Sequence, residues 1–196
     1  MVNKELGIAF RRKMKINIDT ITHASKELIG NIIRTPTIRS QHLSSKINGE
    51  VFLKLENLQY TSSFKVRGAY TSITRLKEDQ KKVGVIAMSA GNHAQAVAWW
   101  AKKERVNATI VMPEHAPLFK VMKTKSLGAD VILRGRTLNE SQTYVSELAS
   151  DKKLTLIHPY DDSNVVIGQG TLGLEFMEDI KAVSYTHLTL PTSDLV

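Results

Sequence analysis

The chain has 196 residues, of which 42% are hydrophobic and 23% are charged, and these ordinary globular values exclude intrinsic disorder for its bulk. Lys and Arg number 27 against 19 Asp and Glu, which gives a formal net charge of +8 at pH 7. The sequence has no cysteine, which excludes disulfides, thiolate catalysis and thiolate metal sites.

The distribution of apolar and charged residues indicates a cytoplasmic protein without a membrane partner. Apolar runs are far shorter than the ~20 residues that span a bilayer. Residues 1–15 mix charges around a very short apolar stretch, whereas a secretory signal needs about 7–15 apolar residues. Positive residues are spread along the chain, and their densest group, residues 11–15, is typical of a solvated tail, so we expect no nucleic-acid partner. The charge favours an anionic small molecule instead.

The first predicted element is an amphipathic helix over residues 19–31, where apolar side chains recur at helical spacing. From residue 51 onward, patterns typical of short strands alternate with patterns typical of helices. Strands are expected at residues 51–55, 83–88, 108–112, 131–133 and 154–157, and helices at 63–77, 92–103, 118–127, 138–149 and 164–180.

This alternation predicts an α/β fold in which right-handed helical crossovers join the strands of an open parallel sheet. The strands are nearly continuously apolar, as expected when helices cover both faces of a sheet. Ligands of such sheets bind outside the carboxyl ends of the strands. The turns that lead into helices are therefore the expected places for site residues, and three of them are unusual.

The first turn, residues 60–69, gathers hydroxyl side chains where a helix is expected to begin, and Ser62 or Ser63 could cap that helix. Lys65 would then lie in the first helical turn, where the helix dipole lowers the pKa of an amine. A lysine with a lowered pKa can form a Schiff base with an aldehyde. The alternative is an ordinary surface lysine.

The second turn, residues 89–95, follows a predicted strand directly and reads Ser-Ala-Gly-Asn-His-Ala-Gln. Its small residues let the backbone approach a ligand, and the free N–H groups of a helix N-terminus bind anions. A carboxylate or a phosphate would fit there, with hydrogen bonds from Asn92 and His93. Taken alone, His93 favours the interpretation as a buried structural histidine.

The third turn, residues 168–173, places Gly168, Gly170 and Gly173 inside a helical pattern. Because each glycine costs about 1 kcal/mol in a helix interior, their presence indicates close backbone packing or a cavity wall. Histidines and carboxylates are not spaced as metal ligands anywhere in the sequence, so we expect no metal site.

Together the three turns resemble those of the pyridoxal-phosphate enzymes of the threonine dehydratase and serine racemase group. The similarity runs from about residue 32 to residue 179, and in detail it favours threonine dehydratase (threonine ammonia-lyase) of the shorter catabolic type. The segments that carry it are Leu53–Gln59, Ser63–Ala69, Ser89–Gln95, Val111–Pro113 and Gly168–Thr171.

The resemblance implies roles for individual residues. Lys65 would hold pyridoxal 5'-phosphate as a Schiff base and later take the α-proton of the substrate. Phe64 would pack beside the pyridine ring, and Asn92 would hydrogen-bond the phenolic oxygen of the cofactor. The substrate carboxylate would be bound by Ser89, Gly91, Asn92 and His93.

The implied reaction is β-elimination, which converts L-threonine, and also L-serine, into a 2-oxo acid and ammonia. Such a reaction belongs to amino-acid catabolism or to isoleucine biosynthesis, and the resemblance implies a homo-oligomeric parent enzyme. Serine racemase or serine dehydratase is the alternative activity, and an inactive fragment of such an enzyme is a further alternative.

The implied fold is the two-lobed open parallel-sheet fold of the type II pyridoxal-phosphate enzymes, with a small lobe inserted into a large one. We expect residues 1–56 and 159–181 in the large lobe and residues 57–158 in the small lobe. Residues 182–196 would be an unmatched tail, either foreign or a divergent edge strand. The family continues past residue 179 into a glycine-rich phosphate loop, so the chain resembles a truncated member with an incomplete large lobe. The first and last predicted helices would then each expose an apolar face.

Overall fold

The computed structural model describes residues 15–180, and its centre is a four-stranded parallel sheet. The strand order is β5-β4-β3-β6, and each neighbouring pair is parallel. These strands are β3 (Val85–Met88), β4 (Ala108–Met112), β5 (Asp130–Leu133) and β6 (Thr155–Leu156). The predicted parallel sheet is thus confirmed for four of the five expected strands.

Helices cover both faces of this sheet because alternate side chains of each strand point to opposite faces. Val85 and Ile110 join a large apolar cluster with α5 (Asn92–Lys103) and α6 (Leu118–Ser126). Ile86 follows Val85 in β3 and therefore points to the opposite face, where it joins a second apolar cluster with side chains of α7 (Leu138–Asp151). The near-continuous apolar character of β3 and β4 follows from this double burial.

A second sheet consists of only two strands, β1 (Thr37–Arg39) and β2 (Phe52–Lys54), which pair antiparallel. The expectation that the strand near residue 52 belongs to the parallel series is therefore wrong. A three-residue strand carries too little pattern to indicate its partner, and the hydrogen-bonding partner precedes it in the chain. The sequence patterns also missed β1 itself and three short helical elements, which are α2 (Gln41–Ile47), η1 (Glu56–Leu58) and α4 (Glu78–Val83).

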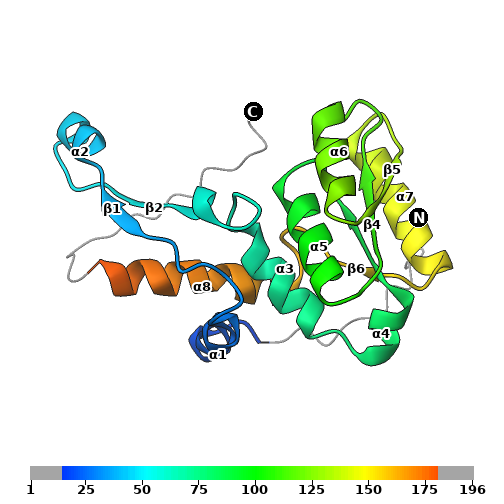
Figure 1. Cartoon of the computed structure of the whole chain (residues 1–196), viewed down its shortest axis with the longest axis horizontal. Coiled ribbons are helices and arrows are strands. Elements are labelled where there is room, and N and C mark those ends of the chain that lie inside the picture. The colour runs from blue at the N-terminus through cyan, green and yellow to red at the C-terminus, as the bar shows by residue number, and fades with distance from the viewer. Residues whose placement is uncertain (1–14, 181–196) are drawn as a thin grey trace, which may run out of the picture.

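Three helices connect the two sheets: α1 (Ile18–Leu28), α3 (Lys65–Thr74) and α8 (Ser163–Asp179). In Figure 1, α3 lies between the parallel sheet and the two-stranded sheet, and α8, in orange, extends from α3 toward β1 and β2. Helix α3 contacts both α5 and α8, and α1 packs on α8. Helix α3 begins at Lys65, and its two contact helices carry the other predicted turns, the second at the start of α5 and the third within α8.

The three glycines of α8 support both interpretations of the third turn, since Gly168 serves close helix packing whereas Gly170 and Gly173 line a groove. A Cβ on Gly168 would lie 2.6 Å from the carbonyl oxygen of Arg67 and 2.7 Å from the Cα of Gly68, so the two helices touch through backbone atoms. Gly170 likewise contacts Ile21 of α1. A Cβ on Gly173, by contrast, would meet no atom within 4 Å.

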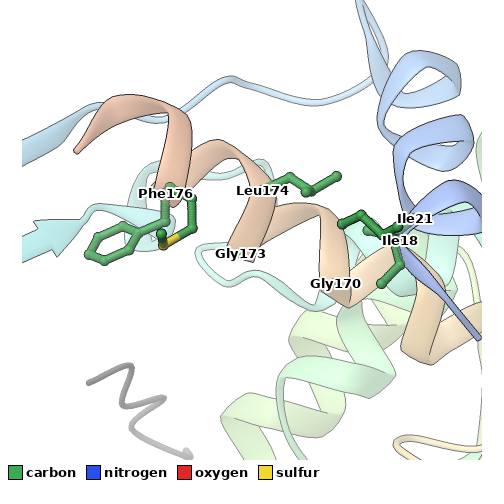
Figure 2. A pocket seen from close by; sticks show the side chains of 7 residues that line it. Ile18, Ile21, Gly170, Gly173, Leu174 and Phe176 are labelled. Atoms are coloured by element: carbon green, nitrogen blue, oxygen red, sulfur yellow. The ribbon is translucent and has the colours of Figure 1, made fainter. Parts of the chain in front are cut away.

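An open apolar groove of about 240 Å³ runs between α1 and α8. Figure 2 shows Ile18 and Ile21 of α1 on one side and α8 with its glycines on the other. The side chains of Ile18 and Met177 are 61% and 55% exposed. The expectation that both helices expose an apolar face is confirmed only in part within residues 15–180, because Ala24 and Leu28 of the predicted face of α1 are buried in the core.

The expectations for the two chain ends, which concern the basic residues 11–14 and the segment 182–196, lie outside the described residues. Within residues 15–180, no helix combines the length and the apolar character that crossing a membrane requires.

Candidate functional site

The first two predicted turns meet at the carboxyl edge of the parallel sheet, where the chain leaves β3 and β6. Because Ile86 pairs with Leu156, Ser89 and Pro159 follow the paired residues at equal distance and leave the same edge of the sheet. The turn after β3 leads into α5, and the turn after β6 leads into α8. Open parallel sheets bind ligands at this edge.

Lys65 is the first residue of α3, and its side chain is directed at this edge. Its Nζ donates a hydrogen bond to the carbonyl oxygen of Pro159 at 3.2 Å, and the side chain is half-buried. The same Nζ lies 5.3 Å from the ring centroid of Phe64. The amine is therefore held at the edge of the sheet and does not point into bulk solvent, as an ordinary surface lysine would.

The N-terminus of α3 is capped less completely than the sequence suggested. The N-cap residue is Phe64, which offers no side-chain hydrogen bond, and Ser62 adopts a left-handed conformation with φ 58°. Ser63 comes nearest to the predicted role, since its Oγ accepts the N–H of Lys65 at 3.3 Å.

The mouth of α5 has the character of an anion site. Its N-cap residue, Gly91, supplies no side-chain cap, so the first N–H groups of the helix keep their capacity to donate. A Cβ on Gly91 would meet no atom within 4 Å, which means open space beside the backbone. The Oγ of Ser89 accepts the N–H of Gly91 at 3.1 Å and fixes the turn. Among residues 15–180, no hydrogen bond to the Asn92 side chain is present.

His93 belongs to the same turn but faces inward. Its ring is 2% exposed, and its Nε2 lies 2.9 Å from the carbonyl oxygen of Ile157. Burial is the main cause that lowers the pKa of His93 to about 4, and the nearby Lys65 and His158 lower it further. The hydrogen bond to Ile157 acts in the other direction and raises this pKa, but it does not outweigh burial. A neutral, buried imidazole offers no charge to a substrate carboxylate, so the structural interpretation of this side chain is the better one.

Sequence reasoning did not single out Arg67, which anchors α3 two residues beyond Lys65. Its guanidinium is fully buried and donates to Glu56 at 2.8 Å and to Glu175 at 2.7 Å. Burial lowers the pKa of Arg67, but the hydrogen bonds to both carboxylates outweigh burial and raise it above its ordinary value. Burial raises the pKa of Glu175, but hydrogen bonds from Arg67 and Lys54 outweigh burial and lower it. The sequence signal that could have identified Arg67 is a charged residue within an otherwise apolar helical pattern.

The residues at this edge fit an aldehyde beside the amine and an anionic group, on the same or on a second molecule, at the helix mouth. An amine stands at one side, and a helix mouth with open backbone space stands at the other. No cluster of His, Cys, Asp and Glu side chains that could hold a metal ion occurs in the described part of the chain. The donor set thus suits a carbonyl compound and an acid group.

Comparison with protein families places most of the chain in one family. The family model described as pyridoxal-phosphate dependent enzyme matches residues 28–194. The matched range includes most of the segment 182–196, whose origin stays a prediction.

Curated relatives and solved structures agree with this family. The catabolic L-threonine dehydratase TdcB of Staphylococcus aureus strain USA300 is 51% identical over 166 residues, which cover 84% of this chain and 48% of that protein. Serine racemase from Dictyostelium discoideum matches with a TM-score of 0.79 and 34% identity over 86% of this chain and 55% of that one. The processed form of threonine deaminase isoform 2 from Solanum lycopersicum matches with a TM-score of 0.76 and 35% identity, over 85% of this chain and 47% of that one. The chain therefore spans about half the length of the curated relatives that it matches.

Proposed function

Because the chain belongs to the family of pyridoxal-phosphate dependent enzymes, we propose that it carries the lysine-bearing part of a threonine dehydratase active site. The observation that carries this proposal is the position of the Lys65 amine, bound to the Pro159 carbonyl at the edge where α5 opens. The 51% identity to a catabolic L-threonine dehydratase supports the choice of substrate.

The proposed reaction removes the α-proton and the β-hydroxyl of L-threonine and hydrolyses the C–N bond, which yields 2-oxobutanoate and ammonia. L-Serine would give pyruvate in the same way. Pyridoxal phosphate supplies, when bound, an aldehyde that an amine can capture and a ring that withdraws electrons from the substrate α-carbon.

The residues of this chain divide the remaining tasks. Lys65 would hold the cofactor and then exchange the α-proton at its Nζ, and Phe64, whose ring lies beside that amine, would pack against the cofactor. The Asn92 side chain would hydrogen-bond the cofactor. Ser89, Gly91 and the N–H groups at the mouth of α5 would bind the substrate carboxylate. For His93 we retain only its backbone N–H in this role, because the imidazole is engaged with Ile157.

Reductive trapping tests the proposal on the chain as it is. The 196-residue chain is incubated with pyridoxal phosphate, reduced with borohydride and digested, and the modified lysines are identified by mass spectrometry. We expect modification to concentrate on Lys65 and to disappear from that peptide in K65A. Equal modification of the exposed lysines, with no preference for Lys65, would refute the assignment. Since the chain spans about half of its relatives' length, we expect weak binding and little turnover.

A serine racemase or serine dehydratase activity is the second candidate. It is favoured by the serine racemase match, whose TM-score of 0.79 exceeds the 0.76 of the plant threonine deaminase. Chiral analysis of serine and assay of 2-oxo acids, with L-serine and L-threonine as separate substrates, distinguish the two reactions. D-Serine formation without 2-oxobutanoate would favour the racemase.

Three further proposals concern the whole molecule. We propose the lobe division with residues 57–158 as the inserted lobe, supported by the presence of all four parallel strands in that range. We propose a homo-oligomeric parent, which light scattering tests. A cytoplasmic location is supported by a sequence without cysteine and is tested by cell fractionation.

A further inference from the structure

His93 lies where three segments of the site converge, although its side chain is closed off from solvent. It is the second residue of α5, it contacts the turn after β6, and its ring is within the electrostatic influence of Lys65. The hydrogen bond to Ile157 joins parts of the chain that are 64 positions apart in sequence. A residue in this place can set the positions of its neighbours without touching a substrate.

The protonation of the ring follows from its partner. A carbonyl oxygen only accepts hydrogen bonds, so Nε2 must carry the proton that it donates to Ile157. The ring is neutral near pH 7, which leaves Nδ1 as an acceptor, and that atom is buried without a partner among the described residues. Within residues 15–180, the donated hydrogen bond to Ile157 is therefore the one polar contact of this side chain.

The hydrogen bond extends a pairing that is otherwise very short. Strand β6 has only two residues, and the N–H of Ile157 just beyond it donates to Ile86 of β3 at 2.9 Å. His93 holds the other polar group of Ile157, its carbonyl oxygen, at 2.9 Å. Both backbone groups of this buried residue are thus fixed, one by the sheet and one by α5.

Two residues further along, Pro159 presents the carbonyl oxygen that accepts from Lys65. We propose that His93 is a positioning residue that clamps the turn after β6 to the mouth of α5 and so holds the acceptor that orients the Lys65 amine. This inference deepens the proposed function, because it concerns the lysine to which that function is assigned.

The test measures the reactivity of Lys65 without any cofactor. Trace acetylation of the full chain with acetic anhydride, followed by peptide mass spectrometry, reports the reactivity of Lys65 relative to the other lysines. In H93L the clamp is lost, the bond to the Pro159 carbonyl weakens, and the relative reactivity of Lys65 should rise by up to about fivefold, the factor expected for the loss of one ordinary hydrogen bond. In H93Q an amide N–H can replace the Nε2 donor, and the reactivity should stay near that of the unmodified chain.

The two variants separate positioning from bulk stability. A stability change alone, with Lys65 equally reactive in H93L and H93Q and both chains folded by circular dichroism, would overturn the proposal. If H93L does not fold, ¹⁵N NMR of the imidazoles in the unmodified chain decides, since a proton on Nδ1 of His93 is incompatible with the clamp and a proton on Nε2 supports it. Failure of pyridoxal phosphate to label Lys65 would refute the proposed function and leave this measurement intact.

Discussion

Replacement of Gly168 by alanine tests the claim that backbone contact between α3 and α8 positions the first turn of the site. The added Cβ would lie 2.6 Å from both the Arg67 carbonyl oxygen and the Thr71 Oγ1, where ordinary contacts begin at 3.4 Å. The helices must therefore separate locally by about 0.8 Å, the difference between these two distances. Overpacking of this kind costs about 1–3 kcal/mol, and the upper part applies because backbone atoms block relaxation.

A matched control exists on the same helix. At Gly173 an added Cβ meets no atom within 4 Å, so G173A should show only the helix-propensity gain of about 1 kcal/mol. The same gain offsets part of the cost in G168A, which leaves a net destabilisation of about 1–2 kcal/mol. The two variants should thus differ by about 2–3 kcal/mol.

Urea unfolding followed by the fluorescence of Trp99 and Trp100 measures this difference. With a slope of about 2 kcal/mol per molar urea, the unfolding midpoint of G168A should lie about 1 M or more below that of G173A. Equal midpoints for the two variants would show that α3 and α8 are not in close backbone contact, and the explanation of how Lys65 is placed would fail.

Three other perturbations give separate expectations. R67M leaves Glu56 and Glu175 buried without their shared partner and should lower the free energy of unfolding by about 3–5 kcal/mol in urea; a loss below about 1 kcal/mol would contradict a buried ion pair. The pKa of His93 is lowered to about 4, so the unfolded chain binds the proton first as pH falls, and stability should decline by about 3 kcal/mol between roughly pH 6.5 and pH 4. Thermal melts across that range should show a shallower decline in H93Q, and an identical decline would exclude His93 as its source. N17A removes the capping box of α1 and should lower the free energy of unfolding by about 1 kcal/mol. An unchanged melting temperature would contradict this expectation.

Local patterns in the sequence determined the regular elements and the place of the site. The predicted bounds of α5 and β4 match the structure because an alanine-rich helical repeat and a continuous apolar run are properties of adjacent residues. The turns that follow parallel strands in an α/β pattern must gather at one edge of the sheet, so Ser89 and Gly91 after β3 could be chosen before any contact was known. Lys65 follows a strand of the other sheet, and its selection rested on the hydroxyl-rich start of a helix instead.

Only the tertiary structure decided what the individual side chains in those turns contact. His93 finds its partner 64 positions away, and Arg67 finds Glu175 at a separation of 108 positions, so no local pattern contains either pair. The pairing of β2 with β1 was likewise open, because three residues fit either sheet. Hydrogen bonds between distant segments depend on how whole helices pack, and in α3 and α8 that packing rests on glycines whose neighbours the sequence does not reveal.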